Sequence, residues 1–221
     1  MILTERDIEL LFILQEYGIL TTRQLALKVF PGVAITTVLR RLRALEGAGY
    51  IRRIEWLPSM ERAWLVTEKA LRWTEGGPAK LHAPRHSLEH DLKLTSLRIQ
   101  LEAHGIVEGW ASEHEIRSLM AQEHGLRESK RRVVPDGIAG VEIKGAKESI
   151  AIELELNFKN SRRYRSIISD YQSKENLHLV WYLVGSAKIG RHVMKAFRQG
   201  YYSNRPPYFC WSILDEVMRA P

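Results

Sequence analysis

The chain has 221 residues, of which 45% are hydrophobic and 27% charged, a balance that is typical of globular proteins and excludes wholesale disorder. Its 33 Lys and Arg exceed its 26 Asp and Glu, so the formal net charge is +7 and nucleic acid is the first candidate partner. With one cysteine, no signal peptide and no apolar run near the roughly 20 residues of a membrane span, the sequence predicts a cytoplasmic protein without membrane contact.

Residues 1–75 are predicted to form three helices followed by a hairpin. The first helix is capped by Thr4 and ended by Gly18, and the second and third are expected at residues 23–29 and 35–48. Two strand-like runs, 51–56 and 63–66, then flank a turn that contains proline, and a short helix opens at 67–70. This order is that of a winged helix-turn-helix domain.

The third of these helices has two chemically distinct faces. Steps of 100° place five aliphatic residues on one face: Ile35, Val38, Leu39, Leu42 and Leu45. The opposite, basic face and the hairpin carry the candidate DNA-contacting residues, which are Thr36, Thr37, Arg40, Arg41, Arg43, Arg52, Arg53 and Arg62. An Arg-bearing helix can enter the major groove and donate two hydrogen bonds to guanine, while hairpin arginines suit phosphate contacts. The stretch resembles the winged helix-turn-helix superfamily, which implies double-stranded DNA as the partner. That superfamily also contains protein-interaction modules, and a solvated basic surface is the alternative explanation of the arginines.

A break in the chain is expected between residues 75 and 86. Two glycines and two prolines fall within residues 76–84, where they disfavour both helix and strand. We therefore predict a DNA-binding domain at 1–75, a linker at 76–86 and a second domain at 87–221.

The second domain is predicted to be a mixed α/β sheet domain. A helix capped by Ser87 ends near residue 104, a strand region covers 106–116, and the polar, basic stretch 118–132 is expected to be a loop, in part helical. Strands at 133–143 and 149–158 are joined by a tight turn, and a helix, a buried strand, a helix and a final strand follow at 160–174, 177–184, 189–199 and 208–214.

An acidic cluster is expected on the paired strands of this domain. Alternation places Glu153 and Glu155 on one face, with Lys159 there too if the strand continues, and the preceding strand can bring Asp136 beside them. Carboxylates so grouped can hold Mg²⁺. A solvated outer strand face is the alternative explanation of the two glutamates.

This pattern resembles the PD-(D/E)xK nuclease-like superfamily over residues 87–214. The resemblance implies a restriction-endonuclease-like sheet flanked by helices, metal ligands at Asp136 and Glu153, and catalytic roles for Asp136, Glu153, Glu155 and Lys159. Glu155 stands where the superfamily pattern has lysine. A Mg²⁺-dependent endonuclease and a catalytically dead scaffold for dimerisation or partner contact therefore remain alternatives.

Over almost its whole length the chain resembles the replication-relaxation family. The motifs that carry this resemblance occur in the family's order: His90-Asp91, Trp110-x-x-Glu113, Pro135-Asp136, Glu153-x-Glu155, Arg163-Tyr164 and Tyr171. The resemblance implies a bacterial plasmid or mobile-element protein that acts in DNA replication or relaxation, or in its regulation. Since one winged helix reads only a few base pairs, we expect a homodimer on a pseudo-palindromic site.

Two further features have two interpretations each. Tyr164 and Tyr171 are either tyrosine nucleophiles beside arginines or one packed helix face, and the seven-residue spacing favours packing. Three basic stretches, 127–132, 162–165 and 188–198, are either DNA contacts or solvated surface.

Overall fold

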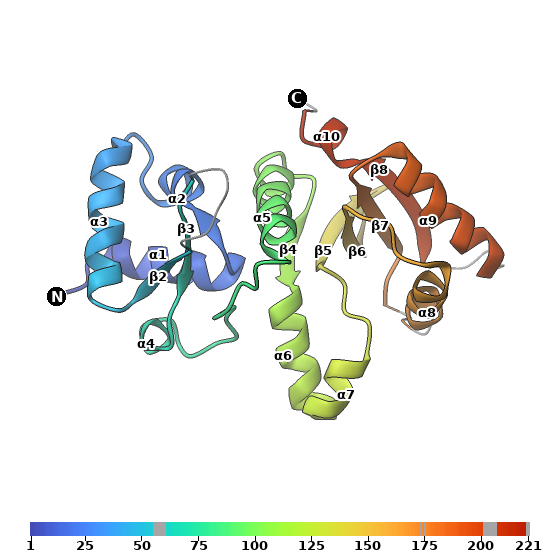
Figure 1. The fold of residues 1–221 in the computed structure, drawn as a ribbon, viewed down its shortest axis with the longest axis horizontal. Helices are drawn as coiled ribbons and strands as arrows, with labels where there is room; N and C mark the ends of the chain where they lie inside the picture. The colour runs from blue at the N-terminus through green and yellow to red at the C-terminus, as the bar shows by residue number, and fades with distance from the viewer. Residues whose placement is uncertain (55–60, 173, 175, 201–206, 220–221) are drawn as a thin grey trace. The chain divides into compact units, whose positions relative to one another are not determined.

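A computed structural model describes residues 1–54, 61–172, 174, 176–200 and 207–219 of the chain. These residues form two compact units, Met1–Ser96 (unit 1) and Leu97–Pro221 (unit 2). Figure 1 shows the helices and strands of each. In the described ranges, every helix is too short or too polar to span a membrane.

Unit 1 begins with the three helices and the hairpin that the sequence predicts. They are α1 (Glu5–Tyr17), β1 (Leu20–Thr21), α2 (Thr22–Val29), α3 (Ile35–Gly47), β2 (Ile51–Ile54), β3 (Ala63–Val66) and α4 (Glu68–Leu71). The strands form an antiparallel sheet of order β1-β3-β2. The winged helix-turn-helix fold is thus confirmed, with the small strand β1 as an addition.

Local signals in the sequence start the first two helices. The Thr4 amide donates to Asp7 Oδ2 at 2.7 Å while the Asp7 amide donates to Thr4 Oγ1 at 3.3 Å. Thr21 and Gln24 form the same reciprocal capping box at α2. Because each pair satisfies two backbone donors within three residues, the chain fixes these helix starts locally.

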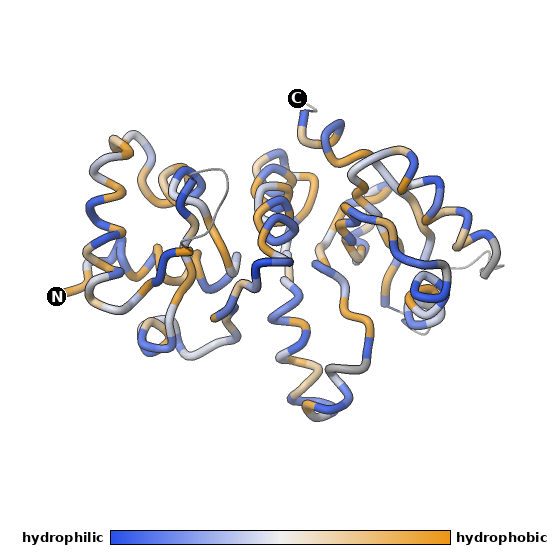
Figure 2. The backbone as a smooth tube through the Cα atoms, viewed as in Figure 1, coloured by the Kyte–Doolittle hydropathy of each residue, from blue (hydrophilic) through white to orange (hydrophobic). Residues whose placement is uncertain are grey.

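The core of unit 1 lies between α1, α3 and the sheet. Leu10 and Leu14 of α1 and Val38 and Leu42 of α3 are fully buried. Ile35, expected on the buried face of α3, is instead 42% exposed, because it begins the helix. Figure 2 shows hydrophilic and hydrophobic residues alternating along α3, as its amphipathic pattern requires.

The expected linker at residues 76–86 is not a free connection. Ala83 and Leu88 pack in the apolar cluster of unit 1, and the Arg52 guanidinium donates to the Leu81 carbonyl. The two units divide inside helix α5 (Leu88–Ala103), after Ser96. The sequence predicts a second domain from residue 87, whereas the division by contacts comes after Ser96, since glycine and proline mark irregular backbone but not the loss of packing.

Unit 2 is built on a five-stranded mixed sheet. Its elements after α5 are β4 (Glu108–Ser112), α6 (Glu113–His124), α7 (Leu126–Arg131), β5 (Gly137–Ile143), β6 (Ala146–Glu155), α8 (Ser161–Gln172), β7 (Leu179–Val184), α9 (Ala187–Gly200), β8 (Tyr208–Ile213) and α10 (Leu214–Val217). The strand order is β4-β5-β6-β7-β8. The first three strands are antiparallel and the last three parallel. The predicted α/β class, a mixed sheet flanked by helices, is confirmed.

The stretch 118–132, expected to be mainly loop, is almost entirely helical. Helix α6 begins at a capping box in which the Ser112 amide donates to Glu115 Oε2 at 2.6 Å. No residue of α6 is buried, so the helix lacks the apolar stripe on which the sequence prediction depended.

Helices α8 and α9 cover one face of the sheet (Figure 1). Tyr164 and Ile168 of α8 join Val193 and Phe197 of α9 in one apolar cluster with Ala151 of β6. The face of β6 that carries Ala151 also carries Glu153 and Glu155. The helix layer therefore lies over the two glutamates.

Candidate nucleic-acid interface and acidic cluster

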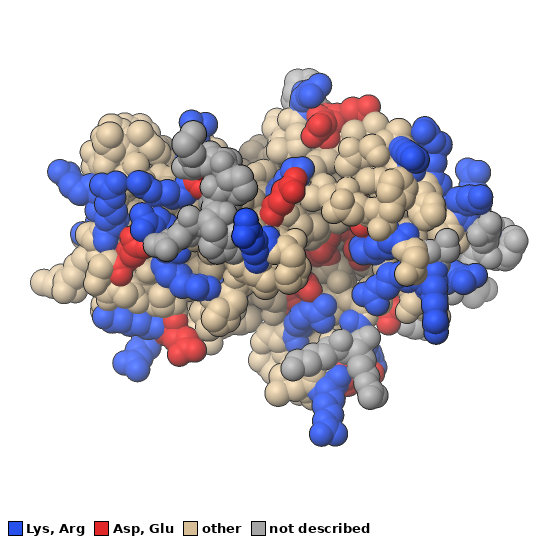
Figure 3. Space-filling view, in the orientation of Figure 1, with Lys and Arg blue, Asp and Glu red and all other residues tan. Residues whose placement is uncertain are grey.

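The outer face of α3 is polar and basic. Thr36, Thr37, Arg40 and Arg43 are all exposed, as the helical spacing predicts. The helix has one acidic residue, Glu46, which lies near its C-terminal end and pairs with Arg53 at 3.8 Å. Figure 3 shows Lys and Arg side chains gathered over the region of α3. This face can present short polar and cationic groups to an anionic groove.

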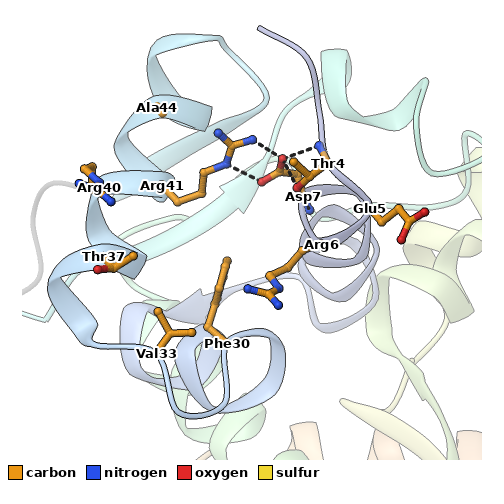
Figure 4. A pocket seen from close by; sticks show the side chains of 10 residues that line it. All are labelled: Thr4, Glu5, Arg6, Asp7, Phe30, Val33, Thr37, Arg40, Arg41 and Ala44. Atoms are coloured by element: carbon orange, nitrogen blue, oxygen red, sulfur yellow. Dashed lines mark hydrogen bonds and ion pairs between the residues drawn. The ribbon is translucent and has the colours of Figure 1, made fainter.

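Arg41 is engaged by a buried carboxylate. Its Nε donates to Asp7 Oδ1 at 2.6 Å and its Nη2 donates to Asp7 Oδ2 (Figure 4). Burial opposes ionisation of Asp7, but hydrogen bonds from Arg41 and Thr4 outweigh it and lower the pKa of the carboxyl. The same bond raises the pKa of Arg41. Arg41 therefore ties α3 to the start of α1, a role the sequence analysis did not assign to it.

A cavity of about 860 Å³ opens beside this ion pair (Figure 4). Residues from the start of α1, the turn between α2 and α3, and α3 itself line it, among them Arg6, Thr37 and Arg40. The Arg6 guanidinium carbon lies 5.8 Å from the centre of the Phe30 ring. Basic residues thus flank α3 on the side of α1 as well as along its outer face.

The hairpin arginines are half-buried, and two of them have side-chain partners. Arg52 donates to the Leu81 carbonyl, and Arg53 approaches Glu46. The Arg62 carbonyl accepts from the Thr22 amide at 2.9 Å, which ties the hairpin to α2. The wing tip, residues 55–60, lies outside the described residues.

In unit 2 the strand register brings Asp136 beside Glu153. Gly137 pairs with Ile152 across the antiparallel β5–β6 ladder, so Asp136 precedes the ladder at the level of Glu153. Asp136 Oδ2 accepts a 2.7 Å hydrogen bond from the Leu154 amide. A Cβ on Gly137 would lie 2.4 Å from Trp110 Cζ2, so the glycine after Asp136 permits close packing.

Glu153 is buried, and its carboxyl group accepts a hydrogen bond from a tyrosine. Its side chain is inside unit 2, with the residue 7% exposed, and the Tyr171 hydroxyl donates to its Oε1. Burial raises the pKa of Glu153 to about 8, and the negative charges of Asp136 and Glu155 add to this rise against the opposing effects of Tyr171 and Lys159. The group is therefore mainly a neutral acid at pH 7.

Glu155 is paired within the same layer. Lys159 Nζ lies 2.6 Å from its Oε2, and Glu155 is 4% exposed. All residues from Ile150 to Glu155 are buried, so the alternative of a solvated outer strand face is wrong. The strand alternation is as predicted, but β6 ends at Glu155, so Lys159 reaches the glutamate from beyond the strand and not as its continuation. The helix layer that covers the two glutamates was not predicted.

The acidic cluster matches a Mg²⁺ site only in part. Asp136 and Glu153 could supply two carboxylates, a number that suffices for Mg²⁺ with water as the other ligands. Burial and the charge of Asp136 raise the pKa of Glu153, and a bound cation would oppose both effects by favouring the ionised carboxylate. Glu155 forms an ion pair with Lys159. Across the described ranges, no group of three His, Cys, Asp or Glu side chains is placed to hold a metal ion.

The two tyrosines of the α8 motif are core residues. Tyr164 and Tyr171 are both fully buried. Burial raises the pKa of Tyr164 to about 12 and that of Tyr171 well above its ordinary value. Neither hydroxyl is placed to attack a DNA phosphate, which favours the packing interpretation of their spacing.

Tyr182 of β7 is a member of this cluster that the sequence analysis missed. It is fully buried, and its hydroxyl has no hydrogen-bond partner among the described residues. Burial raises its pKa, and the nearby charges of Glu153 and Glu155 add to the effect. The register Glu153↔Tyr182 could have identified it only once strands β6 and β7 were known to pair in parallel.

Other motif residues have structural roles. Asp91 is buried, with Lys80 Nζ 2.6 Å from its Oδ2. Burial opposes its ionisation, but hydrogen bonds from His90, Lys80 and Ser87 outweigh burial and lower its pKa. Trp110 is buried under the Arg98 guanidinium, whose carbon lies 5.8 Å from the ring centre.

Comparisons with known proteins give one family and two solved structures. The family model described as Replication-relaxation matches residues 11–177. ZitR of Lactococcus lactis, a zinc-responsive MarR family member, is 19% identical with a TM-score of 0.30, covering 59% of this chain and 78% of that chain. The restriction endonuclease FokI is 11% identical with a TM-score of 0.30, covering 96% of this chain and 42% of that chain. No curated protein matches significantly.

Proposed function

The chain belongs to the replication-relaxation family, and from this premise we propose that it binds duplex DNA in a bacterial plasmid or mobile-element system. Its role there is in replication or relaxation of the element, or in their regulation. The winged helix of unit 1 is the part that recognises DNA, in the cytoplasm where such elements reside.

The outer face of α3 carries this proposal. Arg40 and Arg43 are exposed on a helix whose opposite side is buried, and Thr36 and Thr37 are exposed near its start. A helix of this kind fits the major groove, which is about 12 Å wide, and an Arg there can bond guanine O6 and N7 together. We assign contacts to bases and to the adjoining phosphates to these four residues, and further phosphate contacts to the hairpin arginines.

Arg41 has a different role in this proposal. Because two of its guanidinium nitrogens bond to Asp7, we assign it to holding α3 against α1 rather than to reading bases. Substitution of Arg41 should weaken DNA binding through the position and stability of α3.

A matched pair of variants tests the proposal. Arg40→Gln/Arg43→Gln should weaken duplex binding and lower the slope of log affinity against log salt by about two, roughly 0.9 for each lost phosphate-type contact. Arg72→Gln/Lys93→Gln, which removes two exposed cations elsewhere in unit 1, is the control and should bind normally. Equal slopes for both pairs in a gel-shift titration would refute the role of α3.

We also propose a homodimer on a pseudo-palindromic site, because a single recognition helix reads too few base pairs to specify one site in a genome. Light scattering of the free and DNA-bound protein measures this. A mass of one chain in both states would contradict it.

A second candidate function is Mg²⁺-dependent cleavage by unit 2. The observation that favours it is the position of Asp136 beside Glu153, whose ionisation is opposed by burial and by the charge of Asp136 and would be favoured by a divalent cation. When bound, the metal would neutralise charge on a phosphate oxygen. Of the chain's residues, Asp136 and Glu153 would hold the metal, while Glu155 would orient Lys159, whose positive charge suits a phosphate.

Burial of the glutamates favours the third alternative, a regulator whose nuclease-like unit is a catalytically dead dimerisation scaffold. Calorimetric titration with Mn²⁺ and plasmid nicking, run on the wild type and on Asp136→Asn, separate the two. Metal uptake and nicking that both disappear in Asp136→Asn would establish the nuclease. If the wild type neither binds metal nor nicks plasmid at millimolar Mn²⁺, the nuclease is refuted and the dimerisation scaffold is favoured.

A further inference from the structure

Helix α9 presents a row of cations to solvent. Lys188, Arg191, Lys195 and Arg198 follow one another at intervals of three or four residues, and all four are exposed. The opposite side of the helix is buried through Ile189, Val193, Ala196 and Phe197. The helix has no acidic residue. Such spacing keeps the four charges on one stripe of the helix.

Helix α8 extends this charged surface. Arg162, Arg163 and Arg165 are exposed at its first turns, while Tyr164 points inward. The Tyr164 ring packs against His192 of α9, with 5.7 Å between the ring centres, so the two helices lie side by side. Figure 3 shows Lys and Arg gathered in the region of both helices. We call the seven residues Arg162, Arg163, Arg165, Lys188, Arg191, Lys195 and Arg198 the basic α8–α9 face.

Among the residues that the structure describes, no neighbouring acid neutralises these charges. Within the described part of the chain, none of the seven side chains forms an ion pair. The nearby acids have other partners, since Glu155 pairs with Lys159, and Asp170 lies 3.2 Å from Lys174. Seven like charges in one helix layer repel one another, and a polyanion bound there would relieve the repulsion.

The shape of the face favours a DNA backbone over a membrane. The stripe on α9 runs from Lys188 to Arg198, a rise of about 15 Å, which is long enough to meet several phosphates at roughly 3.4 Å per strand step. A membrane-surface helix needs exposed apolar side chains beside its cations. On α9 the large apolar side chains are buried or half-buried against unit 2.

We propose that the basic α8–α9 face is a second nucleic-acid-binding surface, which holds the phosphate backbone of duplex DNA without reading its base sequence. It is separate from the winged helix, because all seven residues belong to unit 2. Its contribution should therefore be the same for specific and random duplexes.

The test compares two triple variants of the full-length chain. Arg191→Gln/Lys195→Gln/Arg198→Gln removes three charges from the face. Lys144→Gln/Lys147→Gln/Arg219→Gln removes three exposed charges elsewhere in unit 2, outside the three basic stretches, and changes the net charge equally. Fluorescence anisotropy with a random duplex should show that the first variant lowers the salt slope by about 2 to 3 and weakens binding about tenfold or more, while the control stays close to wild type.

Two further arms make the outcome decisive. Both triple variants are also made in the Arg40→Gln/Arg43→Gln background, where the α9 triple should lose the same affinity and salt slope as before. This arm distinguishes a failure of α3 as the recognition helix from a failure of the basic α8–α9 face. Arg191→Lys/Arg198→Lys should bind normally, since it keeps the charges. Equal salt slopes for the two triples would overturn the proposal. So would an unchanged duplex slope with loss of binding to phosphatidylserine vesicles, which would identify a membrane surface instead.

Discussion

Replacing Glu153 by glutamine should stabilise unit 2 at neutral pH and remove most of the pH dependence of its stability. In the folded protein the pKa of Glu153 is raised by burial and by Asp136 from its ordinary 4.5 to about 8. Folding at pH 7 therefore requires uptake of a proton. The stability that protonated Glu153 contributes is complete below pH 4.5 and is lost as the pH rises towards 8.

The size of the effect follows from the shift. Between the two pKa values each pH unit lowers the free energy of unfolding by roughly 1.4 kcal/mol, so the loss from pH 5 to pH 7 is about 3 kcal/mol. Glutamine has the shape of the neutral acid, and its carbonyl can accept the hydrogen bond from Tyr171 without any proton uptake. Glu153→Gln should therefore keep at pH 7 about the stability that the wild type has at pH 5.

Hydrogen exchange of peptides from β6, followed by mass spectrometry at pH 5 to 8 with EDTA present, measures this for unit 2 alone. Comparison of variant and wild type at each pH cancels the intrinsic exchange rate. Glu155→Gln is the matched control, because its carboxylate is paired with Lys159, so its neutralisation should lower the stability at pH 7 without removing the dependence on pH. Parallel pH profiles for the wild type and Glu153→Gln would refute the reasoning.

Three other substitutions have defined outcomes. Asp7→Asn should lower the free energy of unfolding of unit 1 by about 2 kcal/mol in urea titrations above pH 4, because the lowered pKa of Asp7 means that its contribution is lost only in acid. Gly190→Ala should lower the melting temperature, since a Cβ would lie 2.3 Å from Trp211 Cε3. A Cβ at Gly47 would have no atom within 4 Å, so Gly47→Ala should raise the free energy of unfolding by roughly 0.5–1 kcal/mol and with it the melting temperature. Shifts of the same sign for the two glycines would contradict the packing argument.

The parts of the fold that the sequence predicted well depend on contacts between near neighbours. The capping box of Thr4 and Asp7 spans three residues, and the buried side of α3 repeats every three or four. The wing follows from two apolar runs separated by a proline turn. Helix α6 was missed although Ser112 and Glu115 form a capping box, because its surface exposure leaves no apolar period to detect.

Partners distant in sequence could not be predicted in the same way. Asp7 and Arg41 are 34 positions apart. The helical periodicity of α3 places Arg41 on the polar side, but it does not indicate that a carboxylate from α1 lies next to that side. For Glu153, strand alternation predicts which residues share a face. It cannot show that α8 covers this face and supplies Tyr171, 18 positions later, as a hydrogen-bond donor.

The helix layer over the sheet also separates the two kinds of charge in unit 2. Its cations point to solvent from α8 and α9, whereas Glu153 and Glu155 lie beneath, against Tyr171 and Lys159. A helix with its side chains is about 10 Å across, so a phosphate held on the basic α8–α9 face is kept that far from the carboxylates. Binding on this face therefore does not present a phosphodiester to the acidic cluster. If unit 2 cleaves DNA, the substrate must reach Asp136 from the sheet end where β5 begins, and the α9 triple variant should retain nicking of plasmid at saturating protein.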